Sequence, residues 1–217
     1  MTLKSSIEEF SKEWQNYRDF TLSESKSGAS IRIVKQDHKV YDLLHSVIKG
    51  QIENIVNSER YLVAASLGLG NVSAIPWVAI LDKSITTTPS EQFYVVLLFS
   101  RSAKKIYLTL ALGSQQFEKL HGRNSKTLET IKLTTNKFRE IFNDYTPANS
   151  NHKIDLLEDE YNGEQKLASS SRWLTESYEL GTCFGKSYLS EKFDESAISK
   201  DILEFLNVYQ NIVKDPQ

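Results

Sequence analysis

Cysteine and long apolar runs are scarce in this sequence. Cys183 is the single cysteine among 217 residues, so an internal disulfide and a cysteine-rich zinc module are excluded. No apolar run reaches the roughly 18 residues that a membrane span needs, and the polar first ten residues do not resemble a secretory signal. With only 4 prolines and 9 glycines the composition is that of a folded domain, which we expect in the cytoplasm, away from membranes.

Charge of either sign is not in large excess, which excludes a generally basic protein that coats nucleic acid. The chain holds 26 basic and 28 acidic residues, for a net charge of −2. The charge is uneven, because residues 101–140 carry nine basic and three acidic side chains, whereas residues 141–180 carry three and eight. The basic block indicates a polyanionic partner; the alternative is a solvated helix face balanced by the acidic segment that follows.

Hydrophobic periodicity predicts helices near both ends of the chain and a sheet in the middle. Apolar residues spaced by three and four predict helices over residues 3–20, 37–56, 125–142 and 196–213. Short runs rich in valine, isoleucine, leucine and aromatics predict strands over residues 61–67, 75–81, 93–99 and 105–112. Because most of the connections are too short for crossover helices, we expect largely antiparallel pairing.

The remaining segments have weaker patterns. Residues 21–30 are expected to form a loop, residues 154–157 a short strand, residues 158–171 a mobile segment, and residues 178–189 a further strand with a turn. The expected fold is a single α+β domain with a mixed, largely antiparallel sheet flanked by helices. We expect residues 1–60 to form an N-terminal helical region packed on a domain of residues 61–213.

Two segments resemble catalytic motifs without meeting their requirements. The sequence GTCFGKS over residues 181–187 has three residues between its glycine and the Gly-Lys pair, where a phosphate-binding loop needs four, so a strand with a glycine bend is favoured. Asp159 with Glu164 and Lys166 matches the acidic core of metal-dependent nucleases, yet the surrounding EDEYNGEQK has no strand pattern and favours a solvated loop.

The other candidates for chemistry are equally weak. No histidine lies at ligand spacing from another histidine or from Cys183. We expect no metal site, no cofactor and no catalytic set, so a binding module is favoured over an enzyme.

The most informative segment is SLGLGN at residues 66–71 and the strands that follow it. Gly68 and Gly70 permit a tight loop that presents Leu69 at its tip. Trp77 begins the next strand, while Tyr94 and Leu98 share a face of the strand after that, because they are four residues apart. By composition alone, such a set of apolar side chains is most often simple core.

This segment resembles the N-terminal DNA-binding domain of the McrB family, whose members target bacterial restriction systems to modified DNA. The pattern G-x-G-N-x-x-x-[IV]-P-W-x-A-x-[LF] is matched by Gly68, Gly70, Asn71, Ile75, Pro76, Trp77, Ala79 and Leu81. Further matches are Tyr94, Val96, Leu98, Tyr107, Leu108, Gly113, YELG at 178–181 and KSY at 186–188. The resemblance covers about residues 60–213.

The resemblance implies recognition of a modified cytosine, 5-methyl or 5-hydroxymethyl, by base flipping. It places Trp77 and Tyr94 on either side of the extruded base and Leu98 against the modified edge. The loop Gly68, Leu69, Gly70 and Asn71 would insert its leucine into the duplex, where relatives can carry an aromatic residue. Phosphate contacts are expected from the region 113–139 and from the preceding turn, with Arg101, Lys104, Lys105, Arg123 and Lys126 as the named candidates.

The resemblance also implies partners. McrB proteins join this module to a GTP-driven motor that recruits a nuclease subunit, so GTPase and cleavage activity are expected on another domain or subunit of such an antiviral defence system. The alternative is a protein-interaction or assembly module that keeps the fold without base recognition, which the neutral Leu69 and the negative net charge favour. A third, weaker hypothesis is a magnesium-dependent nuclease that uses Asp159 and Glu164.

Overall fold

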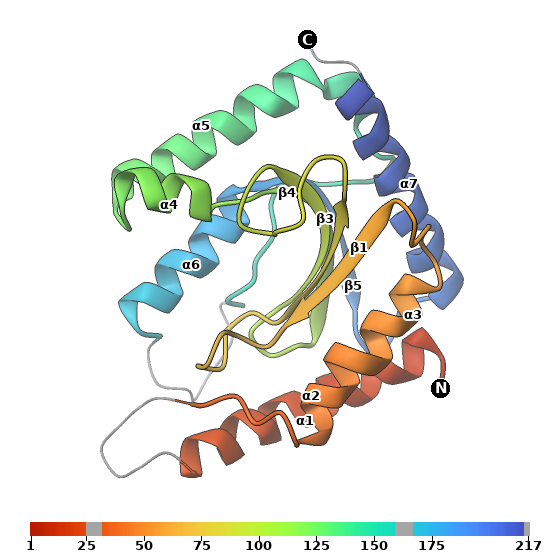
Figure 1. The fold of residues 1–217 in the computed structure, drawn as a ribbon, viewed down its shortest axis with the longest axis vertical. Helices are drawn as coiled ribbons and strands as arrows, with labels where there is room; N and C mark the ends of the chain where they lie inside the picture. Colours follow the sequence, from red (N-terminus) through yellow and green to blue (C-terminus); the bar gives the residue numbers. More distant parts are fainter. Residues whose placement is uncertain (25–31, 159–166, 215–217) are drawn as a thin grey trace.

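The fold is built on one antiparallel sheet with helices around it (Figure 1), and every strand pairs with its neighbour in the sequence. The computed structural model describes residues 1–24, 32–158 and 167–214. The strands are β1 (Tyr61–Ser66), β2 (Trp77–Asp82), β3 (Phe93–Phe99), β4 (Lys105–Leu112) and β5 (Thr182–Leu189), in the order β1-β2-β3-β4-β5. The expected α+β domain is confirmed, and all four strand pairings are antiparallel.

Helices precede the sheet, separate β4 from β5, and end the described chain. They are α1 (Leu3–Ser23), α2 (Lys39–Asp42), the π-helical turn η1 (Leu43–Ile48), α3 (Lys49–Glu53), α4 (Gln115–His121), α5 (Ser125–Ile141), the 3-10 turn η2 (Asn143–Tyr145), α6 (Ser169–Leu180) and α7 (Glu195–Lys214). Local chemistry fixes several of their ends. Thr2 and Ser5 form a capping box at α1, and the Asn124 side chain caps α5 by accepting from the Thr127 amide at 3.0 Å. No helix in the described ranges has both the length and the apolar character for crossing a bilayer.

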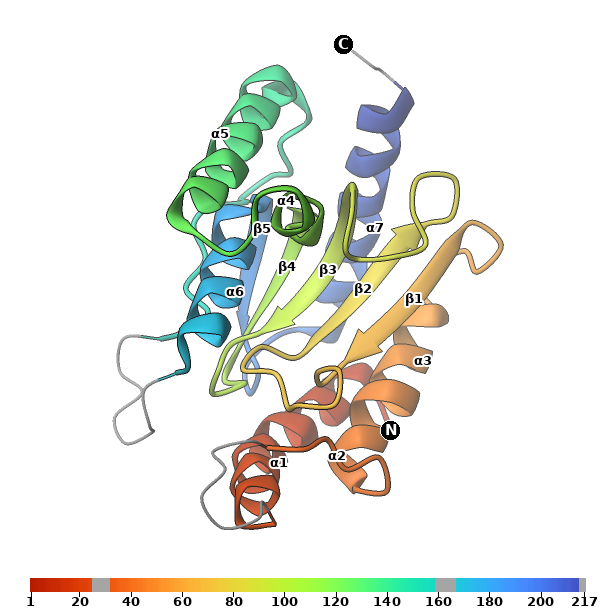
Figure 2. The same cartoon turned by 60° about the vertical axis from the view of Figure 1, so that its left-hand side comes forward.

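The two faces of the sheet are covered by different elements. The first face carries Val78, Val95 and Leu97 and packs against α1, the helical segment 39–53 and α7 in the larger core. The second face carries Ala79, Val96 and Leu98 and is covered by residues 154–156 and by α6. Figure 2 shows α4 and α6 on the side of the sheet opposite to α7. Since β3 is apolar on both faces, it lies in the interior of the sheet, as its sequence predicts.

Some local predictions were wrong. Residues 154–157 form no strand: they cross the second face as an irregular segment whose Leu156 carbonyl accepts a hydrogen bond from the Arg101 amide at 2.8 Å. Residues 178–180 belong to α6 instead of a strand, and β5 begins at Thr182. The residues that α6 buries include Thr175 and Ser177, so it lacks the apolar period that marks a helix in sequence.

Other predicted elements differ in detail or cannot be compared. Helix α1 continues to Ser23, into the expected loop over 21–30, and the helix expected over 37–56 contains the turn η1. Most of the expected mobile segment, including Asp159, Glu164 and Lys166, lies outside the described residues.

Candidate nucleic-acid interface

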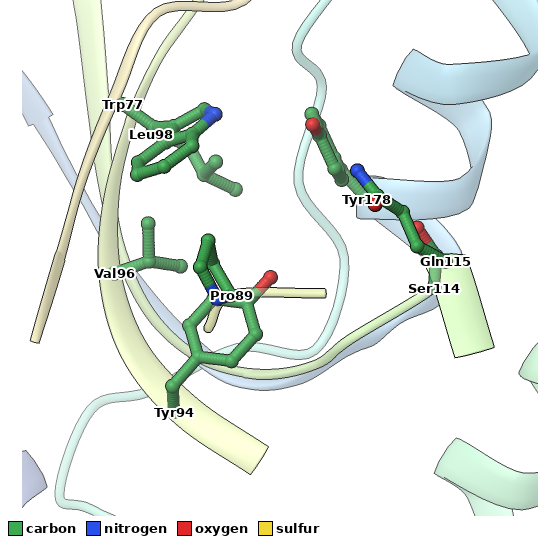
Figure 3. Close-up of a pocket in the computed structure, with 8 residues that line it drawn as sticks. All are labelled: Trp77, Pro89, Tyr94, Val96, Leu98, Ser114, Gln115 and Tyr178. Carbon is green, nitrogen blue, oxygen red and sulfur yellow. The ribbon is translucent and has the colours of Figure 1, made fainter. Parts of the chain in front are cut away.

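The second face of the sheet brings the three predicted pocket residues together. The β2–β3 register pairs Trp77 with Leu98, and Tyr94 lies four residues before Leu98 on the same face. All three line one cavity, which we call the β2–β3 pocket (Figure 3). Its other lining residues are Pro89, Val96, Ser114, Gln115 and Tyr178.

The β2–β3 pocket is narrow in this structure. Its volume is about 30 Å³, which is room for a few water molecules and far less than a pyrimidine base occupies. Figure 3 shows Pro89 next to the Tyr94 ring, with Tyr178 and Gln115 on the opposite wall. The pocket therefore needs a rearrangement of its wall before it can admit a base.

One part of that wall is the loop between β2 and β3, residues 83–92, which carries Pro89 and is joined to α4 by polar contacts. The Ser90 carbonyl accepts from the Gln116 amide at 3.1 Å, and the Ser90 hydroxyl donates to Gln115 Oε1 at 2.9 Å. The loop passes directly over the end of β4, where a Cβ on Gly113 would come within 2.6 Å of the Glu91 amide nitrogen. Gly113 is therefore required by this close approach of two backbones.

Polar groups face the pocket from both walls. Burial raises the pKa of Tyr178 to about 12, although the indole N–H of Trp77, which faces the hydroxyl across the pocket (Figure 3), acts to lower it. Burial also raises the pKa of Tyr94, whose hydroxyl makes no hydrogen bond to any residue in the described part of the chain. Both tyrosines therefore stay protonated at neutral pH, and the Tyr94 hydroxyl is available to a ligand.

Leu69 lies at the tip of an exposed loop, residues 67–72, which we call the glycine loop. The residue is 96% exposed, and both flanking glycines have positive φ, +120° at Gly68 and +79° at Gly70. The loop connects β1 to the segment that leads into Trp77, so the exposed leucine and the pocket belong to one connection. An apolar side chain held this far into solvent is available for insertion into a partner.

A segment that the sequence analysis did not single out supports the glycine loop. Ile33 forms an isolated antiparallel bridge with Asn71. The Val34 amide donates to the Gly70 carbonyl at 2.8 Å, and the Val72 amide donates to the Arg32 carbonyl at 2.7 Å. These contacts hold Gly70, Asn71 and Val72, the side of the loop that follows Leu69.

The five candidates for phosphate contact lie on two separate elements. Arg101, Lys104 and Lys105 belong to the turn before β4 and its first residue, whereas Arg123 and Lys126 lie at the junction of α4 and α5. Lys104, Arg123 and Lys126 are exposed and Lys105 is half-buried. Arg101 is only 9% exposed, and its carbonyl accepts from the Trp14 indole at 3.0 Å.

Arg123 differs from Lys126 in its partners. Its Nε donates to Glu118 Oε1 at 2.7 Å, and its guanidinium lies over the Trp173 ring, 5.7 Å from the centroid. Lys126 has no ion pair with any residue in the described ranges. A phosphate role for all five residues stays a prediction.

The segment that resembles a phosphate-binding loop has a structural role. Gly181 ends α6, and Thr182–Leu189 is strand β5. The Lys186 ammonium pairs with Asp201 at 2.7 Å and with Glu204 at 2.8 Å on α7, so it is already neutralised. Within the described residues no group of three or more histidine, cysteine or acidic side chains is arranged to hold a metal ion.

Sequence reasoning missed the wall of the pocket that faces Trp77. Tyr178 stands in the quoted YELG motif, but no role follows from the motif without the position of α6. Ser114 and Gln115 belong to the start of α4, a helix too short and polar to show a period.

A model of a known protein family matches most of this chain. The family model described as the MrcB-like, N-terminal domain matches residues 24–214, which is most of the sequence. The match begins well before the motifs at residues 66–81, so it includes the helical segment 39–53. No curated protein matches the chain. The chain belongs to the family of MrcB-like N-terminal domains, which confirms the resemblance to McrB and supports a DNA-binding role in general.

Proposed function

We propose that this chain binds duplex DNA at a modified cytosine, 5-methyl or 5-hydroxymethyl, by drawing the base into the β2–β3 pocket. The observation that carries the proposal is the pocket itself, since Trp77, Tyr94 and Leu98 line one cavity together with the unpartnered Tyr94 hydroxyl. Aromatic walls stack on an extruded base, and the polar groups read its edge. Leu69 fills the space that the base leaves in the duplex.

The cost of extruding the base and the gain from stacking it in the pocket are of similar size. Extruding a paired base costs a few kcal/mol, and aromatic stacking returns about 1–3 kcal/mol per base. The pocket also has to widen from about 30 Å³. Moving the loop between β2 and β3, which carries Pro89, would break the contacts of Ser90 with α4. Net affinity therefore depends on phosphate contacts, which makes binding salt-sensitive.

Selectivity for the modification requires more than added apolar area. Burying one methyl group contributes about 0.8 kcal/mol, which is roughly fourfold in affinity. Stronger discrimination needs shape and hydrogen bonds, and the pocket offers Leu98 for the first and Tyr94, Tyr178 and Gln115 for the second. These residues are the proposed determinants of which modification is read.

The proposed role assigns the chain to targeting. A GTP-driven motor and a nuclease subunit of a restriction system would act from other domains or subunits, in the cytoplasm, against modified foreign DNA.

The test is equilibrium binding to one short duplex that is unmodified, or carries a single 5-methylcytosine or 5-hydroxymethylcytosine, at two salt concentrations. The proposal expects tighter binding to a modified duplex and a loss of that preference in Trp77→Ala. Phe20→Ala, which removes a partly exposed aromatic ring from α1, is the matched control. Equal binding to all three duplexes would overturn modification reading, and absence of binding at low salt would favour the protein-interaction alternative.

A further inference from the structure

A second hollow lies between α5, α6 and the segment that leads onto the second face of the sheet. We call it the α5–α6 groove, and its volume is about 400 Å³. Its lining residues are Lys132, Asn136, Arg139, His152, Lys153, Ile154, Glu179 and Leu180. Three permanent cations and one carboxylate therefore share the groove, in a chain whose net charge is −2.

The cations of the groove are not neutralised by the protein. Lys132 and Lys153 are exposed, and neither forms an ion pair with any residue that the structure describes. The Arg139 guanidinium is fixed by carbonyl and amide oxygens: its Nε donates to the Cys183 carbonyl at 3.0 Å, and its other nitrogens donate to the Thr182 carbonyl and the Asn136 side chain. Arg139 thus holds a defined orientation without a carboxylate partner among these residues.

The one carboxylate in the groove, that of Glu179, already accepts a hydrogen bond from the backbone. Glu179 Oε1 accepts a hydrogen bond from the Leu156 amide at 2.8 Å, which secures the segment that crosses the sheet. Burial raises the pKa of Glu179 and lowers that of Arg139, so both charges lie where water stabilises them less well. An anion placed in the groove therefore gains the attraction of three cations, of which Arg139 lies in a partly desolvated setting.

The groove and the β2–β3 pocket flank the same end of one helix. Tyr178 lines the pocket, and the next two residues of α6, Glu179 and Leu180, line the groove. Adjacent residues of one helix therefore line both sites, which places the groove and the pocket within reach of a single bound duplex.

We propose that the α5–α6 groove is a phosphate-binding site that holds backbone phosphates of the DNA whose modified base enters the β2–β3 pocket. Lys132 and Lys153 each contact a phosphate, and Arg139 supplies a fixed guanidinium at the base of the groove. This inference rests on the proposed function. It assigns the phosphate contacts to a site that includes Lys153 and His152, which lie outside the basic block of residues 101–140.

The test compares two double variants with the same charge change. Lys132→Gln/Lys153→Gln removes both exposed cations of the groove, and Lys192→Gln/Lys200→Gln removes two exposed lysines that do not line it. Log affinity for the modified duplex is measured against log salt. The slope shrinks by about 0.9 for each lost phosphate contact. For Lys132→Gln/Lys153→Gln, the groove variant, two contacts are lost. Its affinity should therefore fall by a factor about twelvefold smaller than that of the unsubstituted chain when salt rises from 50 to 200 mM.

A second measurement separates the source of the phosphate. Binding of inorganic phosphate is followed by NMR at constant ionic strength in the unsubstituted chain and in the groove variant. A reduced slope in the groove variant alone supports the proposal. If the salt slope of the groove variant is unchanged but the variant no longer binds inorganic phosphate, the groove is a site for free phosphate and not for DNA. If the variant changes neither the salt slope nor phosphate binding, the groove is not an anion site. Failure of the proposed function is distinct, because the unsubstituted chain would then show no preference for modified DNA.

Discussion

Trp77 of β2 and Tyr178 of α6 face each other across the β2–β3 pocket, with the indole N–H directed toward the tyrosine hydroxyl (Figure 3). The pocket therefore lies between the sheet and α6. The Tyr178 hydroxyl donates to no residue in the described part of the chain, so its proton is available to a ligand. Tyr178 is therefore positioned to donate to an acceptor on the edge of a bound base.

Tyr178→Phe should reduce the preference for a modified duplex without altering affinity for an unmodified one. Losing one hydrogen bond corresponds to about 0.5–1.5 kcal/mol, or roughly 2- to 12-fold in affinity. Equilibrium titration with both duplexes measures the change. Tyr107→Phe is the control, because its hydroxyl donates to the Asp155 carbonyl at 2.9 Å and does not line the pocket. Equal loss of preference in both variants would remove Tyr178 from base reading.

Leu69→Ala should weaken binding to a fully paired modified duplex and leave the stability of the fold unchanged, because the side chain contacts little of its own protein. Removing most of a leucine from the vacated base site corresponds to about 1–2 kcal/mol, or roughly 5- to 30-fold in affinity. The deficit should shrink when the modified cytosine is mispaired, because extrusion is then less costly. Leu120→Ala on α4, where the leucine is 74% exposed, is the control. The same deficit with paired and mispaired targets would contradict the insertion of Leu69.

The two glycines of the glycine loop should respond differently to alanine. At Gly68 a Cβ would lie 1.9 Å from the Asn71 carbonyl oxygen and 2.7 Å from the Ser73 amide nitrogen, so the backbone must move. At Gly70 a Cβ meets nothing within 4 Å, and only its φ of +79° is unfavourable. We expect Gly70→Ala to cost about 1 kcal/mol and Gly68→Ala about 3 kcal/mol. Chemical denaturation measures both costs, and equal costs would show that the close approach is absent in solution.

The strands of the sheet, and the position of Tyr94 and Leu98 on one face of it, could be predicted because they depend on local sequence patterns. The apolar run FYVVLLF predicts an interior strand, and the spacing of Tyr94 and Leu98 alone places them on one face. Trp77 joins them because Pro76 and the glycine loop mark the start of β2. These features depend on residues close together in the sequence.

The opposite wall of the pocket was not predictable, because it depends on contacts between distant segments with polar surfaces. Helix α6 packs beside the start of α4 through a hydrogen bond between the hydroxyls of Ser177 and Ser114 at 3.1 Å. Such a contact leaves no apolar period in either segment. The α5–α6 groove has the same origin, since Lys132 and Lys153 are brought together by the packing of α5 against the segment that crosses the sheet.

Asp82 should make the stability of the fold depend on acid. Its carboxylate, 1% exposed at the end of β2, pairs with Arg60 Nη2 at 2.7 Å and accepts from the Ser84 hydroxyl at 2.6 Å. Burial acts to raise the pKa of Asp82, but the hydrogen bonds from Ser84 and Arg60 outweigh it and hold the pKa below its usual value. The unfolded chain therefore binds a proton first as the pH falls, so this stabilisation is complete above about pH 5 and is lost as the pH drops through 4 and below.

Asp82→Asn should lower the free energy of unfolding by about 2 kcal/mol at pH 7, since it removes hydrogen bonds to a charged acceptor. The difference from the unsubstituted chain should shrink as the pH falls through the lowered pKa of folded Asp82, because the carboxyl group is then protonated in both the folded and the unfolded chain. Urea denaturation across this pH range measures the effect. Asp19→Asn, at an exposed position of α1, changes the net charge equally and is the control. A loss at Asp82 that stays constant with pH would show that the ion pair with Arg60 does not contribute through its charge.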